Sequence, residues 1–222
     1  MEAVALMVDR QPRESAVSVL RRLAQTRGAE EQCDFCAAGL AAQHRHLLEL
    51  ASRRIICVCD PCALRFQDAV GGRFKLIPRD PRALPDFQIT DAEWESLALP
   101  INLAFFFHHS PGAKTVALYP SPAGAMESLL PLTSWAALAE KKPALTALAA
   151  DTEALLVNRV AGARDYFVTP IDACFELVGL IRAHWRGLSG GEAVWEEIGK
   201  FFKRIREAAG LPAAQPREAG HA

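Results

Sequence analysis

Five of the chain's six cysteines lie in one segment, CDFCAAGLAAQHRHLLELASRRIICVCDPC at residues 33–62. Four of them form two C-x-x-C pairs, Cys33 with Cys36 and Cys59 with Cys62. Two such pairs at this separation are typical of a tetrahedral zinc site with four thiolate ligands. We therefore predict that these four residues bind Zn²⁺. Because a closed site has no open coordination position, the predicted role of the ion is to keep the module folded.

Three further side chains in this segment are candidate alternate ligands. Cys57 stands two residues before Cys59, so in a strand both side chains share a face and Cys57 can replace Cys59. The simpler interpretation of Cys57 is a small buried residue beside the site. His44 and His46 are also two residues apart and can approach a metal ion together, but solvated or hydrogen-bonded histidines are the simpler interpretation here.

Rubredoxin-type iron is the main alternative metal, since it is also held by two C-x-x-C pairs. The second cysteine of each rubredoxin pair is usually followed by glycine, whereas Ala37 and Ala63 stand at these positions. The sequence therefore favours zinc over iron.

The residues between the two pairs predict a β-hairpin. HLLEL at 46–50 and IICVC at 55–59 are the expected strands, with ASRR as the turn. A helix with its N-cap at Asp60 is expected to run to the glycine pair at 71–72, and it places Cys62 in its first turn, where the helix dipole favours a thiolate. With a further strand at 73–77, this order is typical of a treble clef or zinc ribbon.

The rest of the chain predicts an α+β domain with an antiparallel sheet and two long C-terminal helices. The proline-rich segment PRDPRALPD is expected to be a linker, and a capping box at Thr90 and Glu93 begins a helix. The predicted organisation is an N-terminal helical segment at 1–30, the zinc module at 31–80, the α+β domain at 86–209 and a disordered tail at 210–222. Four strands are expected at residues 101–108, 115–120, 153–159 and 165–169, and helices at 133–142, 170–185 and 191–209.

Composition narrows the class of partner. The chain of 222 residues has 25 basic and 26 acidic side chains, with no basic run, which argues against binding to nucleic acid or an anionic membrane surface. Its longest apolar run, INLAFFF, is far shorter than the roughly 20 residues of a membrane span. We expect a soluble cytoplasmic protein, and in that reducing compartment clustered cysteines indicate metal or redox chemistry rather than disulfides.

Other candidate residues give weaker signals. Cys174 lies on the apolar face of the helix that begins at Pro170, so a buried, inert thiol is expected. His108 and His109 are expected to be loop residues at the end of a strand. The rigid-looking loop from Tyr119 to Ser128 leaves a hydrolase or transferase as a third hypothesis, without a recognisable catalytic motif to support it.

Several motifs in combination resemble those of a bacterial family of unknown function whose genes lie beside those of nickel–iron hydrogenases. The resemblance extends over about residues 30–206. It implies an accessory role in making or assembling such a hydrogenase, and it carries over no catalytic residues. The motifs are CDFC, HRHLLEL, CVCDPCALRF, YPSPAGAMESLLPL, EALLVNR, PIDACFELVG and IRAHWRGLSGGEAVWEEIGKFF.

Two functional hypotheses follow. The first is a non-enzymatic accessory protein with a structural zinc site, which contacts a hydrogenase subunit or another maturation factor. The second is a redox or metal-delivery protein in which Cys57 with His44 or His46 forms a labile site for iron or zinc.

Overall fold

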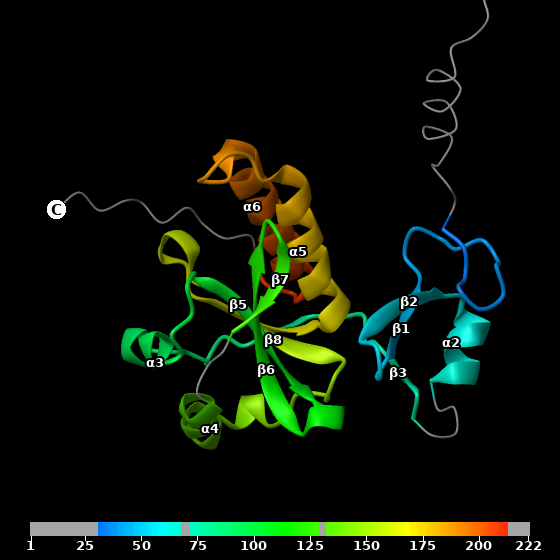
Figure 1. The fold of residues 1–222 in the computed structure, drawn as a ribbon, viewed down its shortest axis with the longest axis horizontal. Helices are drawn as coiled ribbons and strands as arrows, with labels where there is room; N and C mark the ends of the chain where they lie inside the picture. Colours follow the sequence, from blue (N-terminus) through cyan, green and yellow to red (C-terminus); the bar gives the residue numbers. More distant parts are fainter. Residues whose placement is uncertain (1–30, 68–71, 129–131, 213–222) are drawn as a thin grey trace, which may run out of the picture.

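The computed structural model describes residues 31–67, 72–128 and 132–212. They form an α+β fold, in which a small three-stranded sheet with one helix lies beside a larger six-stranded sheet flanked by helices (Figure 1). The predicted fold class is therefore confirmed. The predicted N-terminal helical segment at 1–30 and residues 213–222 of the predicted tail lie outside the described residues.

The small module contains the predicted hairpin. Strands β1 (Arg45–Glu49) and β2 (Arg54–Val58) pair antiparallel, and β3 (Phe74–Leu76) pairs with the other edge of β1. Helix α2 (Asp60–Phe66) follows β2 directly and ends before the glycine pair at 71–72 that was expected to close it. Apolar side chains fill the space between this sheet and α2: Cys33, Leu47, Ile56, Val58, Ala63 and Phe74.

The large sheet is antiparallel throughout, in the strand order β4-β9-β8-β5-β6-β7. Its four longest strands were predicted. Its strands are β4 (Arg82–Ala83), β5 (Leu103–His109), β6 (Lys114–Ser121), β7 (Gly124–Glu127), β8 (Glu153–Asn158) and β9 (Asp165–Pro170).

The two edge strands, β4 and β7, were not predicted as strands. The segment expected to be a linker contains β4, whose Arg82 donates to both carboxylate oxygens of Glu153 at 2.8 and 3.0 Å. The expected rigid loop is a hairpin, in which Pro122 and Ala123 connect β6 to β7. Prolines and glycine at the bend conceal the short β7 strand in the sequence.

Helices lie on both faces of the large sheet (Figure 1). Helices α5 (Ile171–His184) and α6 (Gly191–Ala208) pack on one face, as expected of the two long C-terminal helices. Helices α3 (Asp91–Ser96) and α4 (Leu132–Lys141) pack on the other. Single 3-10 turns occupy Ser110–Gly112, Pro143–Leu145 and Val160–Gly162. Among the described residues, no helix combines the length and apolar character needed to cross a membrane.

Burial on both faces explains the continuous apolar sequence of β5. Phe105 and Phe107 face α5 and α6, and Phe106 faces the opposite core, where it stacks on Trp135 at a centroid distance of 4.5 Å. On α6 the apolar residues from Val194 to Ile205 recur at helical spacing, and all are buried except Trp195, which is 45% exposed. The predicted capping box of α3 is confirmed by the Glu93 amide, which donates to Thr90 Oγ1 at 3.2 Å.

The small module packs directly on the domain. Leu48 from β1 and Ile77 after β3 are buried in the core beneath α5 and α6. Beside them, Lys75 Nζ donates to the buried carboxylate of Asp151 at 2.7 Å. The Ser110 amide and hydroxyl also donate to Asp151, and His109 Nδ1 lies 3.4 Å from it. Burial acts to raise the pKa of Asp151, but Lys75 and Ser110 together lower it.

We expect Asp151→Asn to lower the free energy of unfolding by about 2 kcal/mol at neutral pH, because it weakens charge-assisted hydrogen bonds at this junction. A lowered folded-state pKa means that the stabilisation is present above about pH 4 and is lost as the pH falls through that pKa. Urea unfolding from pH 7 to pH 3 measures this, with the exposed Asp86→Asn as control. A constant difference between the two variants over this range would contradict the assignment.

Candidate metal centres

The first C-x-x-C pair lies in a tight turn before β1. The Cys33 amide donates to the Ala38 carbonyl and the Ala37 amide donates to the Cys33 carbonyl, both at 2.8 Å. Ala37 has a left-handed φ of 57°, at the position where rubredoxin knuckles carry glycine. Asp34 fastens the turn to β2, since its carboxylate accepts from the Cys57 amide at 2.8 Å.

The second pair lies where β2 passes into α2. Cys59 is the N-cap of the helix and Cys62 lies in the first turn, as predicted. The prediction that Asp60 is the N-cap is wrong by one residue, because Asp60 is already the first helical residue and Pro61 follows it. The start of the helix therefore brings the side chains of Cys59 and Cys62 close together.

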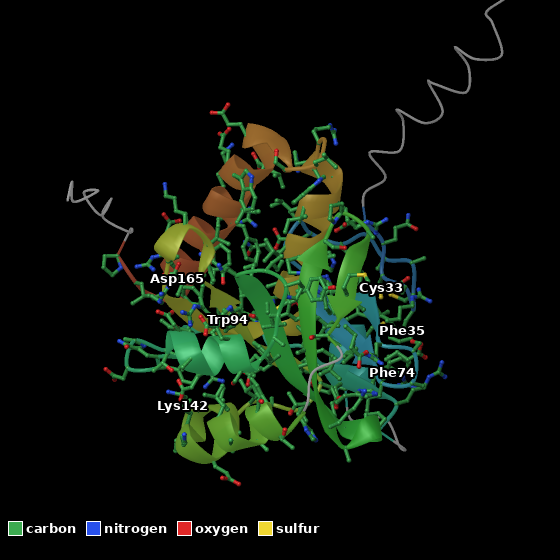
Figure 2. The ribbon with its side chains drawn as sticks, turned by 60° about the vertical axis from the view of Figure 1, so that its left-hand side comes forward. Cys33, Phe35, Phe74, Trp94, Lys142 and Asp165 are labelled. Atoms are coloured by element: carbon green, nitrogen blue, oxygen red, sulfur yellow. The ribbon has the colours of Figure 1, made fainter. Side chains whose placement is uncertain are left out.

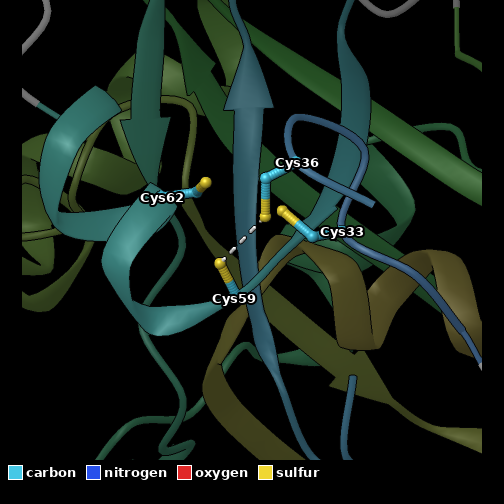
Figure 3. Close-up of side chains that lie close together, drawn as sticks. All are labelled: Cys33, Cys36, Cys59 and Cys62. Atoms are coloured by element: carbon cyan, nitrogen blue, oxygen red, sulfur yellow. Dashed lines mark hydrogen bonds between the residues drawn. The ribbon is translucent and has the colours of Figure 1, made fainter. Parts of the chain in front are cut away.

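The four sulfur atoms converge (Figure 3). All lie within 4.8 Å of one another, and the sulfurs of Cys36 and Cys59 are 3.6 Å apart. Cys33 is buried and Cys36 is exposed. Four cysteine sulfurs at this separation can hold a metal ion, and this set contains all four of the predicted ligands.

Electrostatics at the cluster favour a bound cation. Burial acts to raise the pKa of Cys33, but hydrogen bonds from the backbone amides of Cys59, Phe35 and Cys36 lower it to about 6. Amide donors to sulfur are the usual support of a thiolate ligand. Desolvation, followed by the neighbouring thiols, raises the pKa of Cys62 to about 12. Four thiolates repel one another at this distance, and a cation among them removes that obstacle to ionisation.

Aromatic side chains pack beside the cluster. Phe35 stands between the two cysteines of the first pair, and its ring centroid is 4.2 Å from that of Phe66 and 5.4 Å from that of Phe74. Figure 2 shows Cys33, Phe35 and Phe74 on the same side of the molecule. This packing ties the turn to α2 and β3 by contacts other than a metal ion.

Cys57 belongs to a second group of side chains rather than to the first. Its sulfur and one nitrogen each of His44 and His46 all lie within 4.8 Å of one another. Cys57 and Cys59, which were expected to share a face, fall into different groups, because Cys59 is the N-cap of α2 and its sulfur lies with those of the other three clustered cysteines. Burial raises the pKa of Cys57, and the charges of nearby carboxylates add to this effect.

The weaker candidates have structural surroundings. Cys174 is fully buried, as predicted, and burial raises its pKa to about 12. Its sulfur lies 3.2 Å from Thr169 Oγ1. In the β6–β7 hairpin, Ser121 Oγ donates to the Gly124 carbonyl at 2.9 Å, a contact that stabilises the turn. His108 and His109 lie at the end of β5 rather than in a loop.

We expect Cys62→Ser to remove one equivalent of metal per chain and to lower the free energy of unfolding by several kcal/mol, since serine is a poor substitute for a thiolate ligand. Elemental analysis and denaturant unfolding of the purified protein measure both effects. Cys174→Ala is the matched control and should keep its metal. A Cys62→Ser protein with unchanged metal content would show that the four sulfurs do not act together as ligands.

Comparison with known sequences adds a family. Residues 32–209 match the family described as "Family of unknown function (DUF5947)", and this range contains all four clustered cysteines as well as the large sheet. No curated protein and no solved structure shows significant similarity to the chain. Because the match spans most of the sequence, the chain belongs to this family of unknown function.

Proposed function

We propose that the protein is a non-enzymatic accessory protein whose four-cysteine site holds a structural Zn²⁺ ion, and that it assists the assembly or maturation of a nickel–iron hydrogenase in the cytoplasm. The convergence of four cysteine sulfurs within 4.8 Å carries the proposal. Such a donor set occupies every position of a tetrahedral ion, so it suits a structural role better than catalysis. The function then resides in the surface that the folded module and domain present.

Zinc is the better match to the geometry of the two pairs. Only the first pair is followed by a residue with left-handed backbone, at Ala37. Ala63, after the second pair, is helical and its amide donates to the Cys59 carbonyl at 2.9 Å. A turn for one pair and a helix start for the other is the arrangement of treble-clef zinc modules, and it supports the zinc assignment over rubredoxin-type iron.

The hydrogenase role rests on the resemblance of several motifs to proteins encoded beside nickel–iron hydrogenase genes. Two exposed leucines suit a role in protein contact. Leu64 on α2 is 69% exposed and Leu188, between α5 and α6, is fully exposed. Large apolar side chains at the surface are common at protein interfaces, although single ones also occur elsewhere.

Affinity capture from cells that produce a nickel–iron hydrogenase tests the proposal. We expect the wild-type protein to retain a hydrogenase subunit or maturation factor, identified by mass spectrometry, and Leu64→Asp or Leu188→Asp to reduce its recovery at least about tenfold, a loss of roughly 1.4 kcal/mol. Glu95→Lys on α3, an exposed site distant in sequence from both leucines, is the control. Recovery of no hydrogenase component in any sample would contradict the proposed partner.

A redox or metal-delivery function is the second candidate, favoured by the separate group of Cys57, His44 and His46. A labile site predicts rapid loss of one metal equivalent to a mild chelator, and an iron site predicts visible colour in the purified protein. Colourless protein that keeps all its zinc in the presence of the chelator would rule against this candidate.

A further inference from the structure

The β1–β2 hairpin places two histidines and one cysteine on its domain-facing side. His46 on β1 lies directly opposite Cys57 on β2, and His44 just precedes β1. Side chains alternate along a strand, so His44 and His46 share a face with Leu48, which is buried in the domain core. This face points away from the module core, which contains Leu47.

Hydrogen bonds fix how the two imidazole rings are protonated. His46 Nδ1 lies 2.6 Å from Asp172 Oδ2, and His44 Nδ1 lies 3.0 Å from the Ala41 carbonyl oxygen. Both oxygens are acceptors, so we assign the proton of each neutral ring to Nδ1. Each ring then presents an unprotonated Nε2, which is the form in which histidine binds a metal ion.

The two unprotonated Nε2 atoms lie opposite each other. His44 Nε2 and His46 Nε2 are 3.1 Å apart, with the ring planes at 81°. Two lone pairs at this distance repel unless a cation lies between them, and that cation is either a proton on one ring or a metal ion. The sulfur of Cys57 within 4.8 Å supplies a third donor, which a shared proton does not need.

We propose that His44, His46 and Cys57 form a second metal site, distinct from the four-cysteine site, for a divalent transition-metal ion of the Zn²⁺ or Co²⁺ type. Two imidazoles and one thiolate suit such borderline ions, and three protein ligands leave a fourth position for water or another small ligand. Asp172 is a positioning residue, because its carboxylate orients His46 and increases the basicity of the ring. The site goes beyond the structural role proposed for the four-cysteine site, and it supplies the ligands on which the second candidate function rests.

The surroundings provide charge and access. Glu31 Oε2 lies 3.5 Å from His44 Nδ1, so the carboxylates of Glu31 and Asp172 accompany the two rings. His44 and His46 also line a cleft of about 540 Å³ between the module and the first turns of α5. The cleft therefore gives an ion a path from solvent to the site. With three ligands and carboxylates that support them, the group meets the requirements of a metal site.

Metal stoichiometry of tag-free, full-length protein tests the proposal. After equilibrium dialysis against Zn²⁺, we expect two equivalents for the wild type and one for both Cys57→Ser and His44→Gln. With Co²⁺ in place of Zn²⁺, each site should give its own sulfur-to-metal absorption. Cys57→Ser should lose the absorption of the second site, whereas Cys36→Ser should keep it. Asp172→Asn should keep both sites but bind the second ion about 10- to 100-fold more weakly.

The matched control is His184→Gln, since His184 Nδ1 also contacts a backbone carbonyl, that of Leu180, at 3.0 Å. This variant should keep two equivalents. Saturation of the wild type at one equivalent, with Cys57→Ser unchanged, would overturn the proposal and leave a pair of histidines that shares a proton. If Cys57→Ser does not fold, His44→Gln decides, and Cys36→Ser separates a failure of this site from a failure of the four-cysteine site.

Discussion

The alternation of side chains along β1 is the constraint on which the rest of the structure depends. Leu47 is buried in the core of the small module, and its neighbour Leu48 is buried in the core beneath α5 and α6. A shift in pairing by one residue would exchange these two faces. It would also move His46 away from Asp172. The same strand register therefore packs the module on the domain and brings His46 and Cys57 together.

The module has too little apolar material to depend on its core alone. Among the described residues, its cluster of buried side chains contains Cys33 and Ala63 beside four larger apolar side chains, and small domains of this kind usually need a metal or a disulfide. Two features address this need. An ion held by the four-cysteine cluster would join the turn before β1 to the start of α2, and Leu48 with Ile77 extends the domain core into the module.

Local signals in the sequence predicted much of the fold. The alternating hairpin, the capping box at Thr90 and the long C-terminal helices each follow from residues close together in the chain. The short β4 and β7 strands were missed for different reasons: β4 is formed by pairing with the distant strand β9, whereas the prolines and glycine of the β6–β7 hairpin obscure the strand pattern of β7. Trp195 fits a helical apolar stripe but lies at its margin, where only packing determines exposure.

The two groups of ligands differ in the same way. C-x-x-C spacing is a local pattern, and it predicted the four-cysteine cluster. The sequence also offered Cys57 with His44 or His46 as a labile site, but the pairing of His46 with Cys57 across the hairpin and the contact of His46 with Asp172, 126 residues away, are not local patterns. An ion held by four cysteines ties together segments of the module alone. An ion between His44, His46 and Cys57 would instead add its binding energy to the contact of the hairpin with α5, because Asp172 holds one of its ligands. A metal ion bound there would therefore stabilise the packing of the module on the domain. It would also stabilise the cleft that is lined by His44 and His46 on one side and by α5 on the other.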